Sequence, residues 1–88
     1  MAASPTNADI EREYHRVLRL VRAYGLEAPW ELVPGRERRG EERRTSWQIT
    51  EAGLILFDLG FTRRNAEDAL STIGGVFEWL LSNDIQDD

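Results

Sequence analysis

The chain has 88 residues, a formal net charge of −5, no cysteine and a single histidine. A chain of this length forms one small domain that buries about 60 to 65% of its extended surface, so its stability is marginal. The composition excludes disulfides, thiolate zinc sites and cysteine nucleophiles, and it leaves little material for a histidine metal site or a Ser-His-Asp triad. The excess of acidic residues also argues against nonspecific nucleic-acid binding by the domain as a whole.

The first strong pattern is an amphipathic helix over residues 8–24. Thr6 or Asn7 is a suitable N-cap, and the acidic residues that follow suit the positive end of a helix. Gly25 is a natural stop. Residues 1–7 are expected to be a flexible N-terminus. Six apolar or aromatic residues fall on one stripe at helical spacing: Ile10, Tyr14, Val17, Leu18, Val21 and Tyr24.

The helix and an apolar connector make up residues 8–34, and two prolines in the connector keep it from being helical throughout. Residues 35–45 form an Arg/Glu-rich loop, because mixed charges and two glycines without apolar residues are typical of a solvated segment. An alternative stays open. In it, residues 30–34 and 44–49 pair as strands, and the charged segment is the tip of a long β-hairpin.

The second half of the chain, residues 46–84, predicts a bundle of short helices, and the acidic residues 85–88 form a tail. Ile55 and Leu70 are expected in its core, because each lies on an apolar stripe at helical spacing. The predicted fold class is all-α: a small three-helix bundle with an additional N-terminal helix. The three helices are expected at residues 51–58, 63–72 and 76–82, with glycine turns at Leu59-Gly60-Phe61 and Gly74-Gly75.

No constellation of residues points to catalysis. The adjacent acids Glu67 and Asp68 diverge on a helix, and no glycine pair stands in a phosphate-binding GxGxxG pattern. We therefore expect a domain that is not an enzyme and has no metal or other cofactor. Short helices cannot bury every apolar residue at their ends, which predicts an exposed hydrophobic docking patch with an acidic rim. No apolar run reaches the roughly 20 residues that span a bilayer, so we expect no membrane partner and a cytoplasmic or nuclear location.

Residues 51–83 resemble a ubiquitin-associated (UBA) domain, a compact three-helix bundle. The features that match are Leu59-Gly60-Phe61, then Asn65-Ala-Glu-Asp-Ala-Leu70, then a glycine turn and Glu78-Trp79-Leu80-Leu81-Ser82, with a shortened third helix. In that family the loop after the first helix and the end of the third helix hold the hydrophobic patch of ubiquitin. The resemblance implies binding of ubiquitin or a ubiquitin-like domain through Leu59, Gly60, Phe61, Leu80 and Leu81, with acidic contacts from Asp58 and Glu78.

Two other functions stay open. In a winged-helix-like nucleic-acid-binding domain, the Arg/Glu loop would be the wing and residues 43–53 would lead from it into a helix, although the net charge makes nucleic acid the less favoured partner. In a structural domain, the N-terminal helix would instead mediate self-association. Salt dependence separates these functions, because binding of arginines to phosphates weakens steeply with salt and docking on an apolar patch does not.

Overall fold

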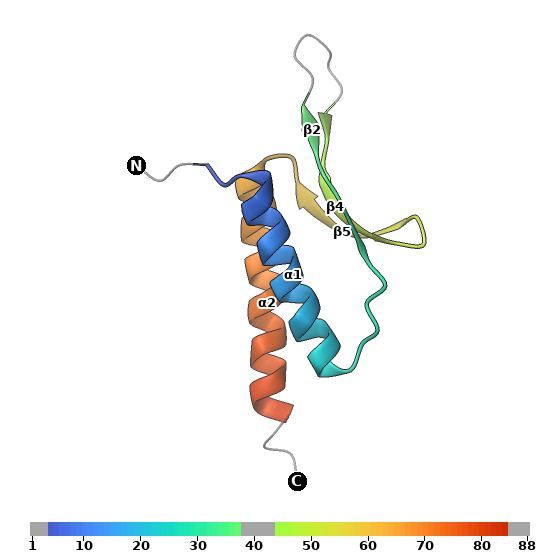
Figure 1. Ribbon diagram of the computed structural model, residues 1–88, viewed down its shortest axis with the longest axis vertical. Helices are drawn as coiled ribbons and strands as arrows, with labels where there is room; N and C mark the ends of the chain where they lie inside the picture. The colour runs from blue at the N-terminus through green and yellow to red at the C-terminus, as the bar shows by residue number, and fades with distance from the viewer. Residues whose placement is uncertain (1–3, 38–43, 85–88) are drawn as a thin grey trace.

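The computed structural model describes residues 4–37 and 44–84, and in these it has a mixed α/β fold, so the all-α prediction is wrong (Figure 1). Strands β1, β4 and β5 form an antiparallel sheet in the order β1-β4-β5, and β2 pairs with β3 in a separate two-stranded ribbon. The elements in chain order are α1 (Asn7–Tyr24), β1 (Glu31–Val33), β2 (Arg36–Glu37), β3 (Arg44–Thr45), β4 (Trp47–Glu51), β5 (Leu54–Gly60) and α2 (Arg63–Asp84).

The helix predicted at residues 8–24 is confirmed as α1. Thr6 is its N-cap: the Thr6 hydroxyl accepts a hydrogen bond from Asp9 N at 3.1 Å, and the Asp9 carboxylate accepts one from Thr6 N at 2.9 Å. The bond from the Thr6 backbone holds the pKa of the Asp9 carboxyl below its usual range. Gly25 ends the helix at a φ of +118°. Of the predicted stripe, Tyr24 is 40% exposed. The other five residues are buried: Ile10, Tyr14, Val17, Leu18 and Val21.

The first predicted bundle helix, residues 51–58, is instead a β-hairpin. Ala52 and Gly53 have φ of +52° and +79°, and positive φ at both positions is what a two-residue type I′ turn requires. Across this turn Glu51 lies opposite Leu54. The run of apolar residues after the turn is too short to show a helical or a strand period by itself. The prediction of a helix at residues 51–58 was wrong for this reason. Ile55, predicted in the core, is 58% exposed.

The second and third predicted bundle helices are one helix, α2, so the predicted break at Gly74–Gly75 is wrong. The apolar residues keep their helical phase through the glycines, and Leu70 is fully buried as predicted. Gly74 lies against α1, where a Cβ would come within 2.6 Å of the Arg16 Nη2 atom. Each glycine costs a helix about 0.5–1 kcal/mol relative to alanine, and packing against α1 offsets that cost.

The two helices lie side by side and run in the same direction (Figure 1). Ser71 Oγ donates to Glu13 Oε2 at 3.3 Å, and Arg16, one turn further along α1, forms an ion pair with Glu78, further along α2. Side chains of both helices pack on one face of the sheet. The buried core there joins the α1 stripe to Ala28, Trp47, Ile49, Leu59, Ala66 and Leu70.

The alternative of a long β-hairpin around the arginine-rich segment agrees with the structure. Leu32 of β1 lies opposite Ile49 of β4, and Arg36 of β2 lies opposite Thr45 of β3. The predicted loop at residues 35–45 is therefore a paired ribbon at both of its ends. Its middle, residues 38–43, lies outside the described residues, as does the predicted acidic tail.

Candidate functional site

The first group of residues predicted to bind ubiquitin lies where β5 passes into α2. Leu59 is 3% exposed and belongs to the core, so it is not available to a partner. The Asp58 carboxylate accepts a hydrogen bond from Gly60 N at 3.0 Å, and it therefore serves the turn itself. Gly60 has a φ of +96°. Phe61 is the member of this group with a large apolar side chain that is exposed, and its exposed fraction is 51%.

The second group lies far from the first along α2. A helix rises about 1.5 Å per residue, so Leu80 lies about 26 Å along the axis from the start of the helix at Arg63. Leu80 and Leu81 are half-buried. Glu78 forms an ion pair with Arg16. The pKa of the Arg16 guanidinium is raised, mainly by its hydrogen bond to Glu13 and next by its hydrogen bond to Glu78. The fold thus leaves the two predicted groups apart, and they form no single docking patch.

A different group of apolar side chains is presented to solvent on β5. Three consecutive residues, which we name the β5 patch, are Leu54, Ile55 and Leu56, with exposed fractions of 72%, 58% and 44%. They follow the type I′ turn directly. Isolated exposed apolar residues are normal on a protein surface, whereas contiguous ones are typical of interaction sites, which makes the β5 patch a candidate.

The patch lies on a strand with a free edge, because among the described strands β5 pairs with β4 alone. The strand contains neither lysine nor proline, two residues that natural proteins use to block edge pairing. Two bulges are present, since Leu56 and Leu59 are extra residues without a partner on β4. Bulges bend a strand and restrict how long a second strand can follow it. The edge is therefore open to a short segment.

Sequence reasoning missed the β5 patch because it placed these residues in a helix. The signal that could have revealed the strand is Gly53, which lies inside the predicted helix 51–58. Before it, Trp47 and Ile49 alternate with polar residues, as in a half-buried strand, and after it comes an apolar run. A glycine between two such runs favours a hairpin over a helix.

A second exposed apolar region is on the later turns of α2. Val76 is 51% exposed and Trp79 is 63% exposed, and these positions share a helix face with the half-buried Ile73 and Leu80. At the same level, Tyr24 at the end of α1 contacts Phe77 edge-on, with ring centroids 5.7 Å apart. This helix surface has no free backbone edge, and it provides a matched comparison for the β5 patch.

The described residues contain no group of three or more His, Asp or Glu side chains placed to hold a metal ion. The Tyr14 hydroxyl is buried without a hydrogen-bond partner in the described part of the chain, and its burial raises the pKa of the phenol. Neither described helix is both long enough and apolar enough to cross a membrane.

Comparison with known proteins gives no relative from which a function could be transferred. No protein-family model matches the chain, and no curated protein and no solved structure matches it either. The candidate site therefore stands on its own geometry.

Proposed function

We propose that this chain is a noncatalytic protein-interaction domain whose β5 edge binds a short, extended, apolar segment of a partner protein. The observation that carries this proposal is the β5 patch, three consecutive apolar side chains on a strand that is paired on one side. Burying a fully exposed Leu or Ile side chain gains about 1.5–3 kcal/mol. Addition of a strand supplies backbone hydrogen bonds, and the exposed side chains give the contact its apolar surface.

Charge indicates which segment fits. Glu51 lies before the turn that leads to the patch and Asp58 lies after it, so both ends of the patch are acidic. An apolar segment with arginine or lysine at its ends is complementary to this arrangement. A second copy of β5 is less suited, because it brings another acidic strand with two bulges from a chain of net charge −5.

Binding of ubiquitin or a ubiquitin-like domain stays an untested prediction. With Leu59 buried and Leu80 distant along α2, the residues that the UBA resemblance nominated do not support one another as a site. Ubiquitin is accordingly one partner to be tried, and the proposed site for any partner is β5.

The test is an NMR titration of the isotope-labelled chain with a synthetic peptide of alternating β-branched residues flanked by arginines. We expect the amides of residues 54–58 to shift and to become protected from hydrogen exchange, since a new strand would satisfy their free edge. Ile55→Arg should abolish these changes, because it places a charge in the patch and repels the basic peptide. Trp79→Ser is the matched control, because it removes a similarly exposed apolar side chain from α2 and should leave binding intact.

Other outcomes are decisive as well. Peptide shifts confined to α2, or equal loss of binding in both variants, would contradict the proposal. Shifts on titration with ubiquitin at Phe61 and Leu81, without change in β5, would favour the UBA-like function instead. Sedimentation that shows a dimer, disrupted by Ile55→Arg in the absence of peptide, would assign the edge to a second copy of the chain.

A further inference from the structure

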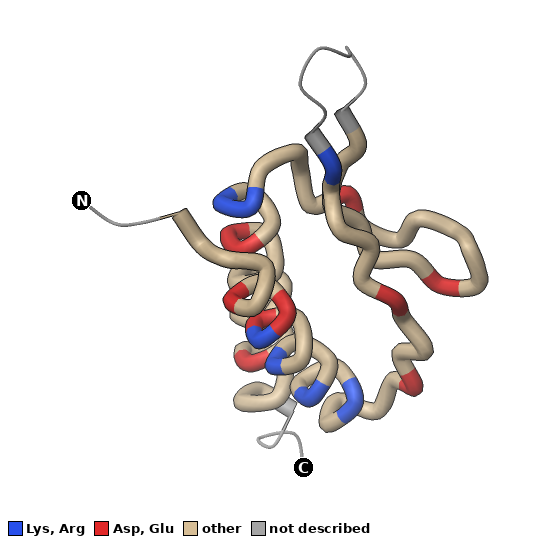
Figure 2. Tube along the Cα trace, turned by 45° about the horizontal axis from the view of Figure 1, so that its top comes forward, with Lys and Arg blue, Asp and Glu red and all other residues tan. Residues whose placement is uncertain are grey.

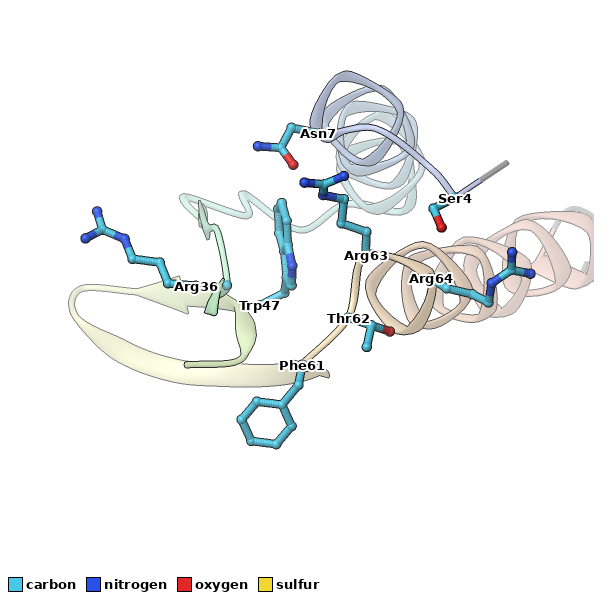
Figure 3. A pocket seen from close by; sticks show the side chains of 9 residues that line it. Ser4, Asn7, Arg36, Trp47, Phe61, Thr62, Arg63 and Arg64 are labelled. Carbon is cyan, nitrogen blue, oxygen red and sulfur yellow. The ribbon is translucent and has the colours of Figure 1, made fainter. Parts of the chain in front are cut away.

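An open hollow of about 700 Å³ lies at the end of the molecule where α1 and α2 both begin (Figure 3). Of the described residues that line it, none is acidic and three are arginines. We name Arg36, Arg63 and Arg64 the arginine row. Arg36 lies on β2, and the other two occupy the first turn of α2, so the fold gathers them from two distant segments. Basic residues on β2 and at the start of α2 are visible at this end in Figure 2.

Trp47 lines the hollow and is 4% exposed. Arg63 lies beside its ring, whereas the side chains of Arg36 and Arg64 point away from it (Figure 3). Gly35 allows the β2 backbone to approach this ring, since a Cβ at that position would lie 2.6 Å from the Trp47 Cδ1 atom. Figure 3 shows the Arg63 side chain between Asn7 and Trp47, with Arg36 and Arg64 on either side. The three guanidinium groups are spread along the surface and do not converge on one point.

Within the described part of the chain, no acidic side chain pairs with the arginine row. None of its three guanidinium groups forms an ion pair with any residue in the described ranges, whereas Arg12 and Arg16 on α1 pair with acids. The first turn of α2 contains no acidic residue, and its two arginines lie at the positive end of the helix dipole. Glu67 and Asp68 lie one turn further along α2, but neither forms an ion pair with the row. More distant exposed charges act weakly, because salt screens them beyond about 10 Å at 0.1 M.

We propose that the arginine row binds the phosphate backbone of single-stranded nucleic acid. Guanidinium groups pair with phosphate through two parallel hydrogen bonds, and a spread row matches successive phosphates better than it matches one phosphate ion. Phe61 also lines the hollow and is 51% exposed, and its ring points to the side away from Arg63 (Figure 3), where it gives a base of the bound strand an aromatic surface. The net charge of −5 and the mixed charges of the Arg/Glu loop disfavour nucleic acid, but neither shows that the fold places Arg63 and Arg64 at the same hollow as Arg36.

The test is the fluorescence anisotropy of a labelled oligothymidine of about 12 nucleotides, measured as the NaCl concentration is raised. Three phosphate contacts on a single strand predict a slope of about −2 for the logarithm of affinity against the logarithm of salt. Affinity should therefore fall about 20-fold between 50 and 200 mM NaCl. Arg63→Gln should weaken binding and reduce the slope by about 0.7. Arg19→Gln is the matched control, since it makes the same charge change at an exposed arginine of α1 outside the hollow.

The proposal is overturned if the oligonucleotide does not bind at low salt, or if the triple variant of Arg36, Arg63 and Arg64 to glutamine binds as tightly as the original chain. A second titration uses inorganic phosphate in place of the oligonucleotide. If millimolar phosphate shifts the amides of residues 63 and 64 while the oligonucleotide does not, the row is a site for small phosphate compounds and the nucleic-acid proposal fails. Circular dichroism of each variant verifies that the fold is retained. This test is independent of the peptide titration at β5.

Discussion

In the β4–β5 hairpin, the strand with more apolar residues is the less buried of the two. Two of the five residues of β4 are apolar, and five of the seven residues of β5 are. Even so, Trp47 and Ile49 of β4 are buried, whereas Leu59 is the only buried residue of β5. The reason is position, because β4 is the middle strand of the sheet under the helices and β5 is an edge strand.

This difference teaches that the apolar residues of β5 are not explained by the core. A strand that needed only to cover its own sheet would show one apolar face and one polar face. The β5 patch instead has three exposed apolar residues in succession, which a solitary domain gains nothing from keeping. The difference between β4 and β5 therefore supports the proposal that β5 binds a partner.

The sharpest test of this comparison is Ile49→Ala on β4. Ile49 is fully buried, so the loss of its side chain should leave a cavity and lower the free energy of unfolding by about 2–5 kcal/mol. In a domain of this size that is enough to unfold much of the population. Chemical denaturation followed by circular dichroism measures the change. A midpoint equal to that of the original chain would show that Ile49 is not part of the core.

A smaller loss is expected from Gly60→Ala, where β5 passes into α2. Gly60 has a φ of +96°, and a Cβ there would come within 2.6 Å of the Asn65 Cβ atom. Both effects oppose alanine, so the free energy of unfolding should fall by about 1–3 kcal/mol. A melting temperature raised by this substitution would mean that the junction has a different backbone.

The turn between the two strands provides a pair of opposite effects. Gly53→Ala should destabilise by about 1 kcal/mol, because Gly53 has a φ of +79° and nothing within 4 Å that a methyl group could pack on. Ala52→Asn should stabilise by a few tenths of a kcal/mol, because Asn tolerates the positive φ found at Ala52 and is favoured in type I′ turns. Thermal melts of both variants measure the difference, and effects of the same sign would argue against the turn.

The smallest effect on stability is expected from Ile55→Thr in the β5 patch. Thr keeps the strand preference and removes apolar surface that is already exposed, so stability should change by no more than about 0.5 kcal/mol. Binding of the apolar peptide should weaken nonetheless. A stability loss as large as that of Ile49→Ala would place Ile55 in the core, as the sequence first indicated, and would remove the difference between the strands.

The sequence predicted the kind of candidate site, an exposed apolar surface, but not its position. An exposed apolar surface with acidic neighbours was expected, and the structure contains one, but at Leu54–Leu56 and not at the predicted residues. The positions differ because exposure depends on which strand lies at the edge. That in turn depends on pairing between β1, β4 and β5, and no local pattern encodes that order. The arginine row was missed for the same reason, since Arg36 and Arg63 come to the same hollow only in the folded chain.

The sequence by itself determined α1, because every signal for it is local. Its cap at Thr6, its apolar stripe and its stop at Gly25 all lie within one continuous segment, and all of them agree. Leu70 was likewise assigned to the core from helical spacing alone. Only the tertiary structure decided that residues 54–60 are a strand and that α2 continues through Gly74. A short apolar run suits either period. Pairing with β4 across the turn selects the strand, and packing of Gly74 against α1, which is far away in the sequence, allows α2 to continue.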